Sequence, residues 1–110
     1  MRGQWRSWLA RNHLKEREVW LRYYSKSSGK PGISYDESVE EAICFGWIDS
    51  RVKKDENLTF IRRFGPRRST EAWSKFNIAR ALKRISEEKM TKAGLAVLPS
   101  RLSTNGGVRV

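Results

Sequence analysis

Apolar residues recur along this chain with two different periods, and the change from one period to the other predicts where helices and strands lie. Trp5, Trp8 and Leu9 fall at helical spacing with polar residues between them, which predicts an amphipathic helix over residues 4–15. Residues 19–24 are instead a run of β-branched and aromatic side chains, which predicts a strand. The chain is therefore expected to begin with a helix and a strand.

A second helix is predicted after a loop rich in Ser, Lys, Gly and Pro. Ser34 and Glu37 have the spacing of a capping box, so this helix should begin there, and Gly46 should end it. Its acidic residues, Glu37, Glu40 and Glu41, are expected to face solvent. Its apolar residues are Tyr35, Val39, Ala42 and Ile43.

Two strand-like runs, residues 47–54 and 58–64, come next with a short connection between them. Such a connection predicts an antiparallel hairpin. A third helix is expected to be capped by Ser69 or Thr70 and to reach about Lys89. Its apolar residues are Trp73, Phe76, Ile78, Ala81, Leu82 and Ile85.

A short last helix is predicted within residues 90–98, with Thr91 as its cap. The predicted order is α-β-α-β-β-α-α, an α+β fold in which a small antiparallel sheet packs against helices. A chain of 110 residues suits one domain, and we expect that domain to span residues 1–98. Residues 99–110 have neither a helical nor a strand period, so we expect a disordered tail there.

The chain is strongly basic, with 23 Lys and Arg against 12 Asp and Glu, a net charge of +11 and a pI of about 10.4. Such a charge favours anionic partners through long-range attraction. The charge is unevenly distributed, because residues 35–50 contain acidic groups and no basic one. An anionic ligand or a nucleic acid is therefore the expected class of partner.

The composition argues against several chemistries. Cys44 is the only cysteine and His13 the only histidine, so neither an internal disulfide nor a zinc site of Cys and His ligands is expected. No base lies near Cys44 in the sequence, which disfavours a cysteine nucleophile. We expect no metal, no cofactor and no catalytic residue. Because no apolar run approaches the length of a membrane span and no signal peptide is visible, we expect a cytoplasmic protein.

Residues 47–80 combine arginines with aromatic residues and form the candidate binding segment. Guanidinium groups suit phosphate or carboxylate, and aromatic faces can stack on bases. Arg67 and Arg68 also precede the predicted third helix, whose first N–H groups favour an anion. The candidate ligand-binding residues are Trp47, Asp49, Arg63, Arg67, Arg68, Trp73, Ser74 and Asn77.

A second interpretation of these residues is structural. In that interpretation the charges form a solvated surface and the Trp residues belong to the core, and for Trp73 core packing is the favoured account. Asp49 could bind a ligand amine or pair with a basic side chain such as Arg63 or Arg67, and the pairing is favoured.

Several motifs together resemble those of a known family. They are GKP at residues 29–31 followed by SY at 34–35, EAICFGWIDS at 41–50, RFGPRR at 63–68, WSKFN at 73–77 and MTKAGL at 90–95. In this order and spacing they resemble the YdeI/OmpD-associated family, whose members are also labelled bacteriocin-protection proteins. The resemblance implies a role in tolerance of antimicrobial peptides or bacteriocins, and an association with a porin or another envelope protein.

The leading hypothesis from the sequence is a non-enzymatic binding or stress-protection domain that holds an anionic ligand on a basic, Trp-containing surface. One alternative is a nucleic-acid-binding protein that uses the basic hairpin of residues 51–68. Another alternative is a small enzyme with a pocket centred on Asp49.

Overall fold

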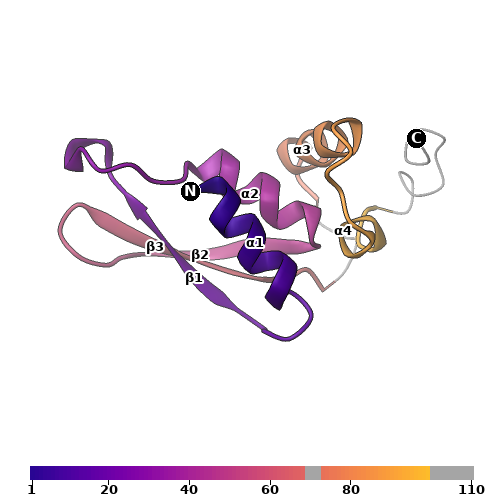
Figure 1. Cartoon of the computed structure of the whole chain (residues 1–110), viewed down its shortest axis with the longest axis horizontal. Helices are drawn as coiled ribbons and strands as arrows, with labels where there is room; N and C mark the ends of the chain where they lie inside the picture. Colours follow the sequence, from indigo (N-terminus) through magenta and orange to yellow (C-terminus); the bar gives the residue numbers. More distant parts are fainter. Residues whose placement is uncertain (69–72, 100–110) are drawn as a thin grey trace.

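The structure, a computed structural model, describes residues 1–68 and 73–99. Within these residues the elements are α1 (Arg2–Asn12), β1 (Val19–Tyr24), the short 3-10 helix η1 (Lys26–Ser28), α2 (Tyr35–Cys44), β2 (Trp47–Lys54), β3 (Thr59–Pro66), α3 (Lys75–Ser86) and α4 (Lys92–Ala96) (Figure 1). The predicted α+β class and the predicted order of helices and strands are confirmed.

The three strands form an antiparallel sheet in the order β1-β3-β2, so β3 is the central strand. The predicted hairpin of β2 and β3 is present, and Leu58 turns the chain with a positive φ of 65° before β3 begins. The register of β2 on β3 shifts between Asp49 and Val52, which leaves two residues of β2 opposite Arg63. A bulge of this kind bends a strand and re-aims its side chains.

Helices α1 and α2 cover one face of the sheet (Figure 1). From α1, the Trp5 ring packs edge-on against Phe64 of β3, with ring centroids 5.1 Å apart. From α2, the Ser38 hydroxyl lies 2.7 Å from the hydroxyl of Tyr23 in β1. Successive side chains of a strand point to opposite faces. Because Tyr23 of β1 points toward the helices, Trp20 and Arg22 of the same strand point away from them.

We call this second face the open sheet face, because no helix of the described residues packs on it and its side chains are half-buried or exposed. Its residues are Trp20 and Arg22 of β1, Ile48, Ser50 and Lys53 of β2, and Ile61, Arg63 and Gly65 of β3. The face is rich in basic side chains and is not part of the core.

Local signals explain where α2 and α4 lie. The predicted capping box at the start of α2 is present, with the Ser34 hydroxyl accepting from the Glu37 N–H and the Glu37 carboxylate accepting from the Ser34 N–H. Thr91 caps α4 as predicted, and its hydroxyl also donates to the Cys44 carbonyl over 2.6 Å. This contact docks α4 on the C-terminal end of α2.

The prediction for the start of the third helix was wrong where it can be compared. Residues 69–72 lie outside the described residues, but Trp73 and Ser74 precede α3, which begins at Lys75. The Ser74 hydroxyl caps the helix by accepting from the Asn77 N–H over 3.1 Å. Two apolar residues of this helix, Phe76 and Leu82, are 75% and 42% exposed. Of the predicted tail, Pro99 is buried and residues 100–110 lie outside the described residues.

Candidate functional site

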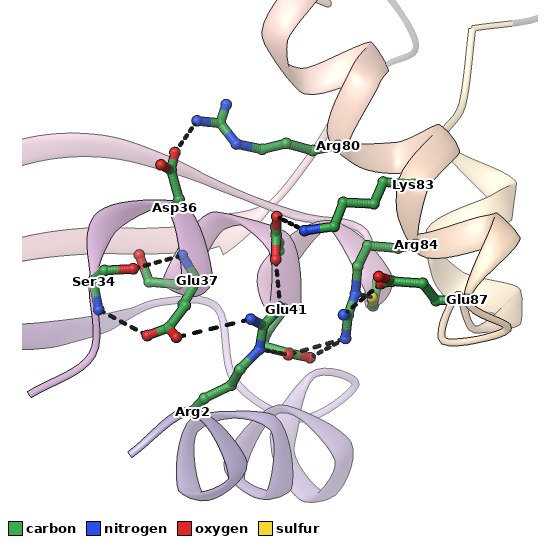
Figure 2. Close-up of polar contacts among 12 residues, drawn as sticks. Arg2, Ser34, Asp36, Glu37, Glu41, Arg80, Lys83, Arg84 and Glu87 are labelled. Atoms are coloured by element: carbon green, nitrogen blue, oxygen red, sulfur yellow. Dashed lines mark hydrogen bonds and ion pairs between the residues drawn. The ribbon is translucent and has the colours of Figure 1, made fainter.

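The sequence pattern predicted that Glu37, Glu40 and Glu41 face solvent. This prediction was wrong for Glu40 and Glu41, whereas the Glu37 side chain is 43% exposed. Glu40 is 7% exposed and Glu41 is 2% exposed. Basic side chains from α1 and α3 surround both carboxylates, and Figure 2 shows Arg2 and Arg84 pointing at Glu41 from opposite sides. We call this group the buried carboxylate cluster; it consists of Glu40, Glu41, Arg2, Arg6, Lys83 and Arg84.

The contacts of the cluster join three helices. Glu41 accepts hydrogen bonds from Arg2 and Arg6 of α1, the latter over 2.9 Å, and from Arg84 of α3 over 3.0 Å. Glu40 accepts from Arg2 and from Lys83, the latter over 2.8 Å. Each carboxylate therefore holds α2 to both of its neighbouring helices.

These contacts shift the pKa of both carboxyl groups in the same direction. Burial by itself would raise the pKa of Glu41, but the hydrogen bonds from Arg2 and Arg6, together with the charge of Arg84, outweigh it and lower the pKa. The pKa of Glu40 is also lowered, because hydrogen bonds from Lys83 and Arg2 outweigh its burial. The cluster is thus a set of satisfied charges, and it leaves no carboxylate open to a ligand.

A different arrangement of arginines lies at one end of the open sheet face. A cleft of about 420 Å³ is lined there by Arg17, Ile48, Ser50, Arg63, Gly65, Pro66 and Arg68. We call it the arginine cleft. Its basic residues come from the segment before β1, from the central strand β3 and from the segment after β3. Three parts of the chain therefore contribute one guanidinium each.

Glycine at position 65 allows the walls of the cleft to approach each other. A Cβ atom at Gly65 would lie 2.9 Å from the carbonyl oxygen of Arg17, closer than real Cβ contacts. The residue therefore has to be Gly if the Arg17 segment is to cross β3 at this point. The bulge of β2 places Ser50 opposite Arg63, and Arg63 Nη1 donates to the Ser50 hydroxyl over 3.2 Å.

The charges of the arginine cleft are mostly uncompensated. Arg63 forms an ion pair with Glu18, whose side chain is 49% exposed. Among the described residues, neither Arg17 nor Arg68 has a hydrogen-bond or ion-pair partner, and both are exposed. Among the described residues, Glu18 thus compensates one of the three guanidinium groups.

The structure brings together two of the eight predicted ligand residues, Arg63 and Arg68, in this cleft. Trp47 is 1% exposed and belongs to the core, with its ring edge-on to Trp8 at 5.7 Å. Asp49 pairs with Arg62 over 3.3 Å and accepts from the Tyr35 hydroxyl. The sequence favoured a pair between Asp49 and a basic side chain such as Arg63 or Arg67. In the structure the ion pair is with Arg62, because Asp49 and Arg62 both point to the helix-covered face, and the charge of Asp49 also acts on Arg67.

The other predicted residues lie near the start of α3. The Arg67 guanidinium stacks over the Trp73 ring at 4.1 Å, and Trp73 Nε1 donates to the Val97 carbonyl over 3.1 Å. Burial lowers the pKa of Arg67, opposed by the charge of Asp49. Ser74 caps α3, and the Asn77 side-chain oxygen accepts from Arg80 over 3.0 Å. These residues make structural contacts with one another and do not line the arginine cleft.

Sequence reasoning missed three residues of this region: Arg17, Ser50 and Trp20. Arg17 lies in a connecting segment with no motif, and only the close pairing of β1 with β3 brings it to the cleft. Ser50 faces Arg63 because of a bulge that no residue type announces. Trp20 was assigned to a strand. Strict alternation along residues 19–24 would have placed its side chain on the other face of the sheet from Val19, Leu21 and Tyr23.

No arrangement for covalent catalysis is visible in the described residues. Cys44 is fully buried, and Arg84 Nε lies 3.4 Å from its sulfur. His13 Nδ1 lies 2.8 Å from the Leu9 carbonyl oxygen, and its ring packs on Phe45. The described residues also contain no group of three or more His, Cys, Asp or Glu side chains able to hold a metal ion, and no described helix could cross a membrane.

The fold and the cleft define a small α+β domain with a basic cleft on an open sheet face. The chain belongs to the family described as a domain of unknown function, DUF8412, whose model matches residues 1–97. Neither the curated proteins nor the solved structures contain a match to the chain. The resemblance to the YdeI/OmpD-associated family stays a prediction.

Proposed function

We propose that this chain is a non-enzymatic binding domain that takes an anionic ligand into the arginine cleft. The observation that supports the proposal most directly is the charge of the cleft, in which Arg17 and Arg68 have no partner among the described residues. Like charges held near one another repel, so their placement around one cleft costs free energy that a bound anion would recover.

The chemistry of the lining suits a phosphate or a carboxylate. Guanidinium groups donate paired hydrogen bonds to such anions, and each charge-assisted bond contributes about 1.5–3 kcal/mol. The Ser50 hydroxyl adds a neutral donor beside Arg63. A volume of about 420 Å³ falls within the range of small-molecule sites, roughly 300–1,000 Å³. Ile48 and Pro66 provide apolar lining for the less polar part of a ligand.

The Glu18 carboxylate competes with a ligand for the Arg63 guanidinium. Its carboxylate pairs with Arg63, but both side chains are exposed, 49% for Glu18 and 39% for Arg63. Exposed pairs of this kind contribute at most about 1 kcal/mol. A phosphate that contacts Arg63 together with Arg17 and Arg68 would therefore displace Glu18 at little cost.

The stress-protection role implied by the family resemblance is part of this proposal. In that role, the domain would act by holding an anionic target and not by transforming it. The proposal also includes the envelope partner that the resemblance implies, since a porin or a lipid surface can present anionic groups to the cleft.

The proposal is tested by isothermal titration with inorganic pyrophosphate at low salt. The unsubstituted chain should bind, and Arg17→Ala and Arg68→Ala should each weaken binding about tenfold, the loss of one charge-assisted hydrogen bond. Arg11→Ala is the matched control, because Arg11 is an exposed arginine of α1, on the other side of the sheet. Absence of binding, or equal losses in all three variants, would refute the proposal.

A further inference from the structure

We propose that the ligand of the arginine cleft is a single-stranded nucleic acid, with a phosphate in the cleft and the neighbouring base stacked on Trp20 of the open sheet face. This inference rests on the proposed function and names the class of ligand. It is carried by the adjacency of two features on one face of the sheet, the guanidinium groups of the arginine cleft and the half-buried ring of Trp20.

Strand register places these two features side by side. Trp20 of β1 is directly opposite Arg63 of β3, and Arg63 lines the cleft. The Cβ atoms of directly opposed residues in antiparallel strands lie about 4.5–5.5 Å apart. Because the two side chains start from neighbouring positions on the same face, one nucleotide can reach both the ring and the cleft.

A lysine side chain covers the face of the Trp20 ring on which a base would stack. The Lys53 ammonium lies over the ring, 4.8 Å from its centroid, and Lys53 is exposed. An exposed cation–π contact is weak, whereas a base stacked on an aromatic side chain adds more to binding. A base can therefore take the ring face, and the freed ammonium can move to the next phosphate.

The rest of the open sheet face continues the same chemistry. Arg22 of β1 and Arg51 beside the bulge are exposed, and Arg22 pairs with the part-exposed Asp55 over 2.9 Å. Ile61 lies between Arg22 and Lys53 in the sheet and adds apolar surface. A strand of several nucleotides would thus meet basic side chains beyond the first phosphate.

A single strand fits this face better than a duplex does. Stacking on Trp20 requires the flat side of an unpaired base, which is hidden inside a base-paired helix. The open sheet face also has no helix among the described residues that could enter a groove (Figure 1). An acidic peptide would satisfy the arginines and would gain nothing from the Trp20 ring beyond apolar contact.

The experiment measures fluorescence anisotropy of a labelled eight-nucleotide oligo(dT) at several salt concentrations, with pyrophosphate binding measured in parallel. Oligo(dT) should bind more tightly than pyrophosphate. With three phosphates contacted, the logarithm of the binding constant should fall against that of salt with a slope of about −2. Arg68→Ala should reduce that slope, whereas Trp20→Leu should lower oligonucleotide affinity about tenfold without changing pyrophosphate affinity.

Trp20→Tyr is the companion variant, because it keeps a stacking ring and should retain most of the affinity that Trp20→Leu loses. Equal binding of Trp20→Leu and the unsubstituted chain, or tighter binding of a duplex or of an oligoglutamate peptide, would overturn the inference while pyrophosphate binding preserved the proposed function. Loss of pyrophosphate binding as well would overturn both. A circular-dichroism melt of each variant identifies any that fails to fold, and Trp20→Tyr then decides the result.

Discussion

Two regions of this molecule hold arginines in opposite ways. In the buried carboxylate cluster, Arg2, Arg6 and Arg84 share Glu41, which is 2% exposed. In the arginine cleft, one of the three guanidinium groups, that of Arg63, pairs with a carboxylate among the described residues, and that carboxylate is itself exposed. The same side-chain type therefore joins helices in one place and remains available in the other. Net charge alone would not distinguish the two.

The difference shows which part of a charge of +11 can act on a partner. Guanidinium groups that already donate to buried carboxylates would have to break those bonds to bind anything else. Guanidinium groups at a solvated cleft give up only bound water and one weak ion pair when they bind a ligand. Substitutions in the first region should change stability, and substitutions in the second should change binding.

The largest effect is expected from removing Glu41. Glu41→Ala would leave Arg84, which is 7% exposed, without its main partner. Removing one member of a buried pair costs about 3 kcal/mol or more, which corresponds to a fall in Tm of roughly 12 °C or more. Urea unfolding followed by circular dichroism measures this change. Pyrophosphate affinity measured at a temperature where the variant is folded should be unchanged.

Glu16→Ala is the control for this substitution. Glu16 is exposed, and its side chain has no partner among the described residues. It should change the free energy of unfolding by less than about 0.5 kcal/mol. If Glu41→Ala were as mild as Glu16→Ala, the cluster would not be holding the helices together, and the contrast between the two regions would disappear.

The second prediction concerns pH. The folded pKa values of Glu40 and Glu41 are lowered, so the folded state binds fewer protons than the unfolded state, in which a glutamate has a pKa of about 4.3. The cluster therefore contributes its full stability above that pH, and the contribution is lost as pH falls through the lowered folded values. Urea midpoints between pH 6 and pH 3 should decrease, and Glu41→Gln should flatten that decrease. An equally steep decrease in Glu41→Gln would assign the acid sensitivity to other groups.

The strands and caps could be predicted because their signals are local. Residues 19–24 and 47–54 carry the β-branched and aromatic residues that favour strands, and they form β1 and β2 with those bounds. Ser34 and Glu37 satisfy each other within one turn, so the start of α2 depends on nothing distant. Two boundaries were placed less well. Leu58 was assigned to the second strand of the hairpin, but it turns the chain before β3 begins. The start of α3 was misplaced because short caps such as Ser74 compete with other serines nearby.

The two charged regions could not be predicted because their partners are distant in sequence. Glu41 resembles a solvated residue until α1 and α3 are packed on it, and its partners lie 35 to 43 positions away. Glu18 and Arg63 are separated by 45 positions, and the cleft between them depends on strand pairing and on Gly65. Residue types grouped Arg67 with Arg68, whereas only the fold separates Arg68, which lines the cleft, from Arg67, which stacks on Trp73.

A smaller effect is expected at Ser74, a residue that sequence placed with the ligand and the structure places at a helix cap. Ser74→Ala removes the acceptor for the Asn77 N–H and should lower the free energy of unfolding by about 1 kcal/mol. Its pyrophosphate affinity should equal that of the unsubstituted chain. Ser74→Asp keeps an acceptor at the cap and should restore stability. A weaker pyrophosphate affinity in Ser74→Ala without a change in stability would mean that Ser74 contributes to ligand binding and not to the helix cap.

The smallest effect, and the one that separates the two regions most sharply, is expected at Glu18. Glu18→Gln removes the only carboxylate that pairs with the cleft among the described residues. Since the pair is exposed, the free energy of unfolding should change by less than about 1 kcal/mol. Pyrophosphate should bind a few fold more tightly, because Arg63 no longer has to leave a partner and one repulsive charge is gone. The same change of Glu to Gln at position 41 should do the reverse, lowering stability and leaving affinity unchanged. A Glu18→Gln variant with weakened binding would mean that Glu18 positions Arg63 for the ligand instead of competing with it.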